Sequence, residues 1–137
     1  IKEDCLFCKI AKGEIHSATV YEDSHFTVIL DVNPATKDID LIIPKEHFDN
    51  IYDLDGETAG KLFALATCIA RAMKDALKCD GLNLIQNNGE VAGQTVNHFH
   101  LHLIPRYEGD GLNLNWPQQE ISGEQLEEIR QSIKKSI

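Results

Sequence analysis

The chain has 137 residues, of which 42% are hydrophobic and 26% charged, and its net charge is −9. This length suits a single domain, residues 1–137, with a proper hydrophobic core. The negative charge argues against polymeric nucleic acid and anionic membranes as partners, because both are bound mainly through Lys and Arg. No run approaches the ~20 apolar residues of a membrane span, and no secretory signal is visible, so we expect a cytoplasmic protein.

Hydrophobic patterning predicts five strands, one long helix and a short C-terminal helix. In chain order we expect strands over 18–21, 26–30 and 39–43, a helix over about 57–78, strands over 82–86 and 96–104, and a helix over 123–135. Asp55 is a candidate N-cap of the long helix, and Gly81 is a candidate stop after it. Hairpin-linked strands with one long helix favour an α+β domain with a mostly antiparallel sheet, with a core over about 4–112 and a tail over 113–137.

Three histidines alternate with apolar residues in the run from His98 to Ile104. In a β-strand this period of two places His98, His100 and His102 on one face and the apolar side chains on the other. Imidazoles repeated along one face suit a site for protons, metal or charge at neutral pH.

The spacing of the histidines disfavours one metal ion bound by all three. Successive histidines would lie about 6.7 Å apart along a strand, and the outer two about 13 Å apart. The donor atoms of a tetrahedral ion lie within a few ångström of one another. At least one imidazole is therefore expected to be free of metal, and such a ring can act as a nucleophile or a proton carrier.

Near the N-terminus, Cys5 and Cys8 form a C-x-x-C pair, which is half of a common structural zinc site. A complete site needs two further donors, and His47 and His98 are the candidates. The alternatives are a turn of small residues and a redox pair, although a redox pair would more naturally follow a strand and open a helix.

The loop before the histidines is rich in small and polar residues. Gly93, Gln94 and Thr95 offer backbone N–H groups, an amide and a hydroxyl, which together can hold a phosphate without a lysine. Asp31 follows an apolar strand and could accept hydrogen bonds from a ribose diol. In isolation, the loop is more typical of an ordinary turn, and Asp31 of a residue at a strand end or in a turn.

The histidine run and the segment before it resemble the histidine triad (HIT) family. The matching segments are Gln86–Val96 and His98–Ile104, and the wider chain agrees at Cys5–Ile10, Val20–Asp23, Leu30–Pro34 and Ile43–His47. These segments are most similar to bacterial members of the Hint branch. The resemblance covers about residues 4–112 and implies a HIT-like fold.

The resemblance implies a nucleotide hydrolase or transferase that acts at the α-phosphate of purine nucleoside phosphoramidates or related adenylate conjugates. His100 is then the nucleophile that forms a nucleotidyl-histidine intermediate, which water hydrolyses. His102 orients the phosphate oxygens and assists the leaving group, and His98 completes the catalytic set.

The same resemblance implies the residues of a nucleotide site. Asp31 would bind the ribose, and Gln94 and Thr95 would contact the phosphate. The others are Asn87 and Gly93 on the phosphate side, and Ile29, Val32, Phe7 and Ile10 as walls around the base.

Some members of the family bind a structural zinc ion through residues that match Cys5, Cys8, His47 and His98. The resemblance implies no organic cofactor. The expected partners are a purine mononucleotide or adenylated small molecule and a second copy of the chain, because the family usually forms homodimers in which the helix and the tail contribute to the interface.

One residue departs from the family pattern. Ile39 stands where a fourth active-site histidine is expected, and its side chain can neither donate nor accept a hydrogen bond. A slower enzyme or an altered substrate is one hypothesis. A nucleotide-binding interaction or regulatory protein with weak catalysis is the alternative.

Overall fold

The computed structural model describes residues 4–31 and 38–137, so Val32, an expected wall of the base site, lies outside the described residues. In chain order the elements are α1 (Leu6–Ala11), β1 (Thr19–Glu22), β2 (Phe26–Leu30), β3 (Asp40–Pro44), α2 (Gly56–Leu77), β4 (Gly81–Ile85), the 3₁₀ helix η1 (Glu90–Ala92), β5 (Leu101–Arg106) and α3 (Gly123–Ser136). None of the helices in this part of the chain is both long and apolar enough to cross a bilayer.

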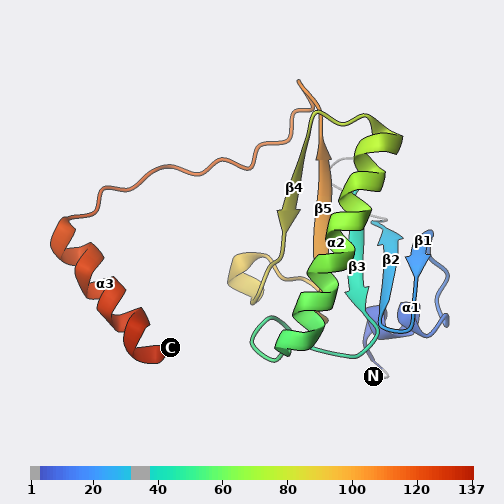
Figure 1. Ribbon diagram of the computed structural model, residues 1–137, viewed down its shortest axis with the longest axis horizontal. Helices are drawn as coiled ribbons and strands as arrows, with labels where there is room; N and C mark the ends of the chain where they lie inside the picture. The colour runs from blue at the N-terminus through green and yellow to red at the C-terminus, as the bar shows by residue number, and fades with distance from the viewer. Residues whose placement is uncertain (1–3, 32–37) are drawn as a thin grey trace.

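The strands form one five-stranded sheet in the order β1-β2-β3-β5-β4, and every neighbouring pair is antiparallel. This arrangement confirms the predicted α+β class. The last strand, β5, is inserted between β3 and β4 (Figure 1). The histidine run therefore enters the interior of the sheet, whereas β4 forms an edge.

Helix α2 covers one face of the sheet (Figure 1). Its apolar residues recur at three- and four-residue steps and pack on strands β2, β3 and β5. Buried members of this core include Leu62, Ala66, Ile69 and Met73 of α2 and Val28, Ile42, Leu101 and Leu103 of the sheet.

A smaller cluster lies on the opposite face and includes α1. It consists of Cys5, Phe7, Cys8, Ile29, Ile39, Leu41, Ile43 and Ile104. Because side chains alternate along β3, Leu41 and Ile43 belong to this cluster while Ile42 belongs to the α2 core. Both faces of the sheet are thus covered near the histidine run.

Of the two predicted ends of helix α2, the structure confirms the N-terminal one. Asp55 caps the helix as predicted, and its carboxylate accepts the N–H of Thr58 at 2.9 Å, an interaction typically worth about 1 kcal/mol. The predicted stop at Gly81 is wrong. The helix ends at Leu77, and Lys78 itself adopts the left-handed conformation with φ 53°, so Gly81 is free to begin β4.

The histidine strand begins later than its alternation predicts. The sequence predicts a strand from about Val96, whereas β5 starts at Leu101 and continues through Pro105 to Arg106. The reason is that the N–H of Phe99 donates to the carbonyl of Phe48 at 2.7 Å. The first part of the run is therefore held by the loop after β3 and not by the sheet ladder.

The tail confirms its predicted helix, since α3 begins at Gly123 and carries a capping box formed by Ser122 and Gln125. An extended segment leads from the sheet to α3, which lies apart from the rest of the domain (Figure 1). Its apolar residues Leu126, Ile129 and Ile133 are all exposed.

A carboxylate, Asp40, is buried beneath α2 and is only 4% exposed. Burial, and secondarily the charge of Asp38, raises the pKa of Asp40 to about 6. Since the unfolded value is about 3.9, folding disfavours the ionised form, and the protein loses stability as the pH rises from about 4 through about 6.

We expect Asp40→Asn to raise the free energy of unfolding by about 1–2 kcal/mol at neutral pH, because the amide is not charged. Below about pH 4 the two proteins should be equally stable. Urea denaturation at both pH values measures the difference. A variant that is less stable than the wild type at neutral pH would show that the Asp40 carboxylate is stabilising.

Candidate functional site

The histidine run keeps its two faces apart. Phe99, Leu101 and Leu103 lie in the core beneath α2. His98 and His100 lie on the other side, where the ring of Phe7 meets each of them edge-on, with ring centroids 6.1 and 4.9 Å apart respectively. The alternation in the sequence thus sorts the rings correctly, although the first two histidines precede the strand.

The ring of His100 is held by one backbone hydrogen bond. Its Nδ1–H donates to the carbonyl oxygen of His98 at 2.7 Å. This bond fixes the tautomer in which Nε2 carries the lone pair. Burial lowers the pKa of His100, so the ring is neutral at pH 7.

His102 stands beside His100, with ring centroids 4.9 Å apart. Burial, followed by the neighbouring His100, lowers the pKa of His102. The negative charge of Asp31 acts in the opposite direction and favours a higher pKa at both His100 and His102. The structure therefore brings Asp31, at the end of β2, within electrostatic reach of the two histidines.

His98 belongs to a different group of side chains. Its ring is fully buried, and its Nδ1 lies 3.3 Å from the Sγ of Cys5 and 3.4 Å from the Sγ of Cys8. His47 adds a fourth donor, with Nδ1 3.3 Å from the Sγ of Cys8. The four donor atoms all lie within 4.8 Å of one another and could hold one metal ion.

The distances and the outer hydrogen bonds of this Cys–His cluster fit zinc. Tetrahedral zinc with bonds of about 2.3 Å to sulfur and about 2.0 Å to nitrogen places S and N about 3.5 Å apart. Nε2 of His98 donates to the carbonyl of Pro44 at 2.8 Å, and Nε2 of His47 lies 2.7 Å from a carboxylate oxygen of Asp49. Both Nδ1 atoms thereby face the thiols, as in zinc sites whose histidines are oriented by carboxylate or carbonyl groups.

Sequence reasoning missed α1 and these two outer partners. Cys5 caps α1, because its thiol accepts the N–H of Cys8 at 3.4 Å. Six residues are too few to show a helical period. Asp49, two residues after His47, could have been found as a carboxylate near a candidate ligand, whereas the Pro44 carbonyl left no signal in the sequence.

The loop before the run is braced by Gln94. The side chain is buried, its oxygen accepts the N–H of Gly89 at 2.8 Å, and its amide donates to the carbonyls of Asp49 and Val96 at 2.6 and 3.0 Å. These bonds join the loop to the segment that carries His47. A phosphate contact by this side chain would require it to give up one of them.

Gly93 and Asn87 lie close together in this loop. Gly93 has φ 99°, and a Cβ there would lie 3.4 Å from the amide nitrogen of Asn87. Glycine is therefore needed at this turn for its backbone angle.

Thr95 is exposed and lines a cavity of about 390 Å³ that also borders Cys5 and His47.

The expected walls of the base site occupy the smaller core. Ile29 and Phe7 are buried in it, and Ile10 packs against it from α1. Ile39 lies in the same cluster and is 3% exposed. An apolar side chain thus fills the position where the family pattern has a fourth histidine.

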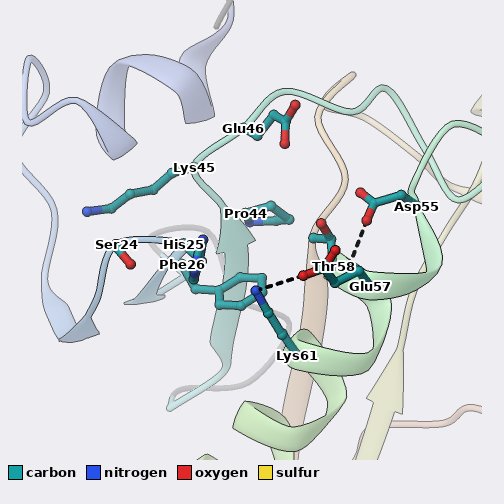
Figure 2. A pocket seen from close by; sticks show the side chains of 10 residues that line it. All are labelled: Ser24, His25, Phe26, Pro44, Lys45, Glu46, Asp55, Glu57, Thr58 and Lys61. Carbon is teal, nitrogen blue, oxygen red and sulfur yellow. Dashed lines mark hydrogen bonds and ion pairs between the residues drawn. The ribbon is translucent and has the colours of Figure 1, made fainter.

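A separate cavity of about 420 Å³ lies at the N-terminal end of α2 (Figure 2). Three of its charged groups interact with residues close by: Lys61 Nζ lies 3.3 Å from Glu57, and Asp55 caps the helix. No residue of the histidine run lines it. We therefore place the candidate site at His100 and His102.

The fold and the alternating histidines define a histidine triad protein, and comparison with known proteins agrees. The family described as HIT domain matches residues 12–109. The crystal structure of a HIT family member from Bacillus subtilis is 45% identical, with a TM-score of 0.93 and coverage of 98% of each chain. The chain belongs to the HIT family.

Two further relatives bear on the chemistry. The Saccharomyces cerevisiae protein named adenosine 5′-monophosphoramidase HNT1 is 38% identical over 130 residues, which are 94% of this chain and 80% of that protein. The structure of a zinc-bound histidine triad family protein from Mycobacterium smegmatis is 38% identical, with a TM-score of 0.76 and coverage of 98% of each chain.

We expect Cys8→Ser to lower both the zinc content and the melting temperature of the purified protein, because a closed metal site contributes folding energy. The matched control is Cys68→Ser, on the exposed side of α2, which should change neither. Elemental analysis and thermal denaturation with and without chelator provide the measurements. A wild-type protein without zinc, whose melting temperature chelator leaves unchanged, would exclude the structural ion.

Proposed function

We propose that the protein is a nucleotide hydrolase of the histidine triad type, which cleaves purine nucleoside phosphoramidates or related adenylate conjugates at the α-phosphate. The carrying observation is the hydrogen bond from Nδ1 of His100 to the His98 carbonyl. It leaves Nε2 with a lone pair, and this ring is not a member of the Cys–His cluster. The name of the yeast relative, adenosine 5′-monophosphoramidase, supports this substrate class.

The reaction would proceed in two displacements. In the first, the phosphate anion of the bound substrate would favour the protonated form of His102. Nε2 of His100 attacks the α-phosphorus, the bond from phosphorus to the amine nitrogen breaks, and that nitrogen leaves with the electron pair and takes the proton from this protonated His102. In the second, water attacks phosphorus and gives its proton to His102, and the bond to Nε2 breaks. AMP and the free amine are the products, and both rings return to their starting state.

The surrounding residues would position the nucleotide. Asp31 would bind the ribose hydroxyls, since its charge already acts on His100 and His102. Thr95 and the backbone around Gly93 would contact the phosphate. Gln94 would hold the loop through its backbone bonds, and Ile29, Phe7 and Ile10 would wall the base.

Zinc would have a structural role in this proposal. Cys5, Cys8, His47 and His98 would hold it, and a closed tetrahedral site keeps no position for substrate. His98 would then act on the reaction only through its carbonyl oxygen, which positions His100.

We expect His100→Ala to reduce turnover of adenosine 5′-phosphoramidate by about 10³-fold or more, because the attacking atom is lost. AMP binding should persist, since the ribose and phosphate contacts remain. The control is His25→Ala, an exposed histidine before β2, which should keep full turnover. Steady-state kinetics and calorimetric AMP titration supply the data, and normal turnover by the His100 variant would refute the mechanism.

A nucleotide-binding regulatory protein with weak catalysis is the second candidate function. It is favoured by Ile39, which fills a buried position with a side chain that offers no hydrogen bond. This function predicts that the wild-type protein binds AMP saturably and yet turns over adenylated amines only slowly or not at all.

We also propose that the protein forms a homodimer. The apolar residues Leu126, Ile129 and Ile133 of α3 are between 49% and 59% exposed, and β4 presents an unpaired edge within the described sheet. An amphipathic helix of this kind becomes stable in water by burying its apolar stripe against a partner.

We expect Ile129→Glu to shift the protein from dimer to monomer in sedimentation velocity, because a carboxylate on the apolar stripe opposes its burial. Gln131→Glu adds the same charge elsewhere on the exposed surface of α3 and should leave the dimer intact. A monomeric wild type would rule the dimer out.

A further inference from the structure

A second candidate site lies on the face of the sheet away from the triad. The register of β3 and β5 pairs Leu41 with His102, and residues paired across a ladder share a face. Asp40, the preceding residue on β3, therefore points to the opposite face, beneath α2. Asp40 and the catalytic histidines are thus separated by the thickness of the sheet.

Among the residues that the structure describes, the buried Asp40 carboxylate has no partner. It is 4% exposed, and within residues 4–31 and 38–137 no hydrogen bond or ion pair reaches it; only the like charge of Asp38 acts on it. Burying a charge in this way is unfavourable unless an opposite charge or a donor compensates for it. A ligand that brings a positive charge would supply the missing partner.

Asp40 opens into a cavity of about 260 Å³ between the C-terminal half of α2 and strands β1, β2 and β3. Apart from Asp40 and Asp38, the lining is apolar and includes Val20, Leu30, Ile69, Met73, Ala76 and Leu77. At about 30 Å³ per liquid water, the cavity has room for roughly nine non-hydrogen atoms. This is smaller than the ~300–1,000 Å³ of sites for drug-sized ligands.

We propose that this cavity binds a small primary amine with an apolar body, whose ammonium group pairs with Asp40 and whose hydrocarbon part lies against Met73 and Ala76. An apolar cavity whose lining carries the carboxylates of Asp40 and Asp38 favours a ligand that combines a positive charge with a hydrophobic group. The proposal stands apart from the proposed nucleotide chemistry, because none of its residues belongs to the triad face.

The probe is phenethylamine, a primary amine with nine non-hydrogen atoms, titrated into the full chain at neutral pH. Amide chemical shifts in ¹⁵N-labelled protein should show saturable binding with a dissociation constant on the order of a millimolar, as suits so small a ligand. The shifts should centre on α2 and β1–β3. 2-Phenylethanol, which has the same size and no charge, should bind about ten-fold more weakly.

Three variants test the assignment. Asp40→Asn should weaken phenethylamine binding by about ten-fold or more, and Ala76→Leu should abolish it by filling the cavity. Asp75→Asn, which removes one exposed charge from α2, should leave binding unchanged and so controls for general attraction of cations to a chain of net charge −9. Thermal denaturation of each variant confirms folding.

No saturable binding to the wild type, or the same affinity in the Asp40 and Asp75 variants, would overturn the proposal. Unchanged binding by a folded Ala76→Leu protein would overturn it as well. None of these results bears on turnover at His100, so this proposal and the proposed function can fail separately.

Discussion

The hydrogen bond between His100 and the backbone of His98 is the contact on which the candidate site depends. The carbonyl of His98 fixes the His100 tautomer, and this carbonyl is itself held because the ring of His98 is locked by Pro44 and two thiols. The ring of His98 is occupied by these contacts and is not available to the substrate. The carbonyl of the same residue nevertheless sets the orientation of the His100 ring, which is available. Any ion bound by the Cys–His cluster would tighten the same link, since it would fix the ring more firmly.

The central sheet separates two chemical environments. On one face, α1 and the loop before the histidine run bring together imidazoles, thiols and the Asp31 carboxylate. On the other face, α2 covers an apolar core in which Asp40 is the exception. Adjacent residues of β3 and β5 point to opposite faces of the sheet. Neighbours in the sequence therefore lie in different chemical environments. Changes on one face can therefore be tested with little direct effect on the other.

Much of this arrangement follows from local patterns. The alternation around His98, His100 and His102 predicts which rings share a face, because a period of two survives even where the ladder is missing. The long helix and its Asp55 cap follow from an apolar stripe and a capping residue. The pairing of Cys5 and Cys8 with His47 and His98 is anticipated by ligand chemistry, and the structure brings the four together.

Other features depend on contacts between distant segments and leave no local pattern. The start of β5 is set by the carbonyl of Phe48, which captures the N–H of Phe99. The end of α2 is set by the left-handed conformation of Lys78, a residue type that rarely adopts it. Asp40 lies within a strand that the sequence predicts, and only the packing of α2 reveals that it is buried.

The most direct test of the account is to identify the atom that becomes covalently attached to AMP. Wild-type protein mixed with an adenylated amine, quenched in the first turnover and digested for mass spectrometry should carry the nucleotidyl group on the peptide that contains His100, at that ring. A labelled His98 or His102, or turnover without any covalent adduct, would contradict the assignment of His100 as the nucleophile.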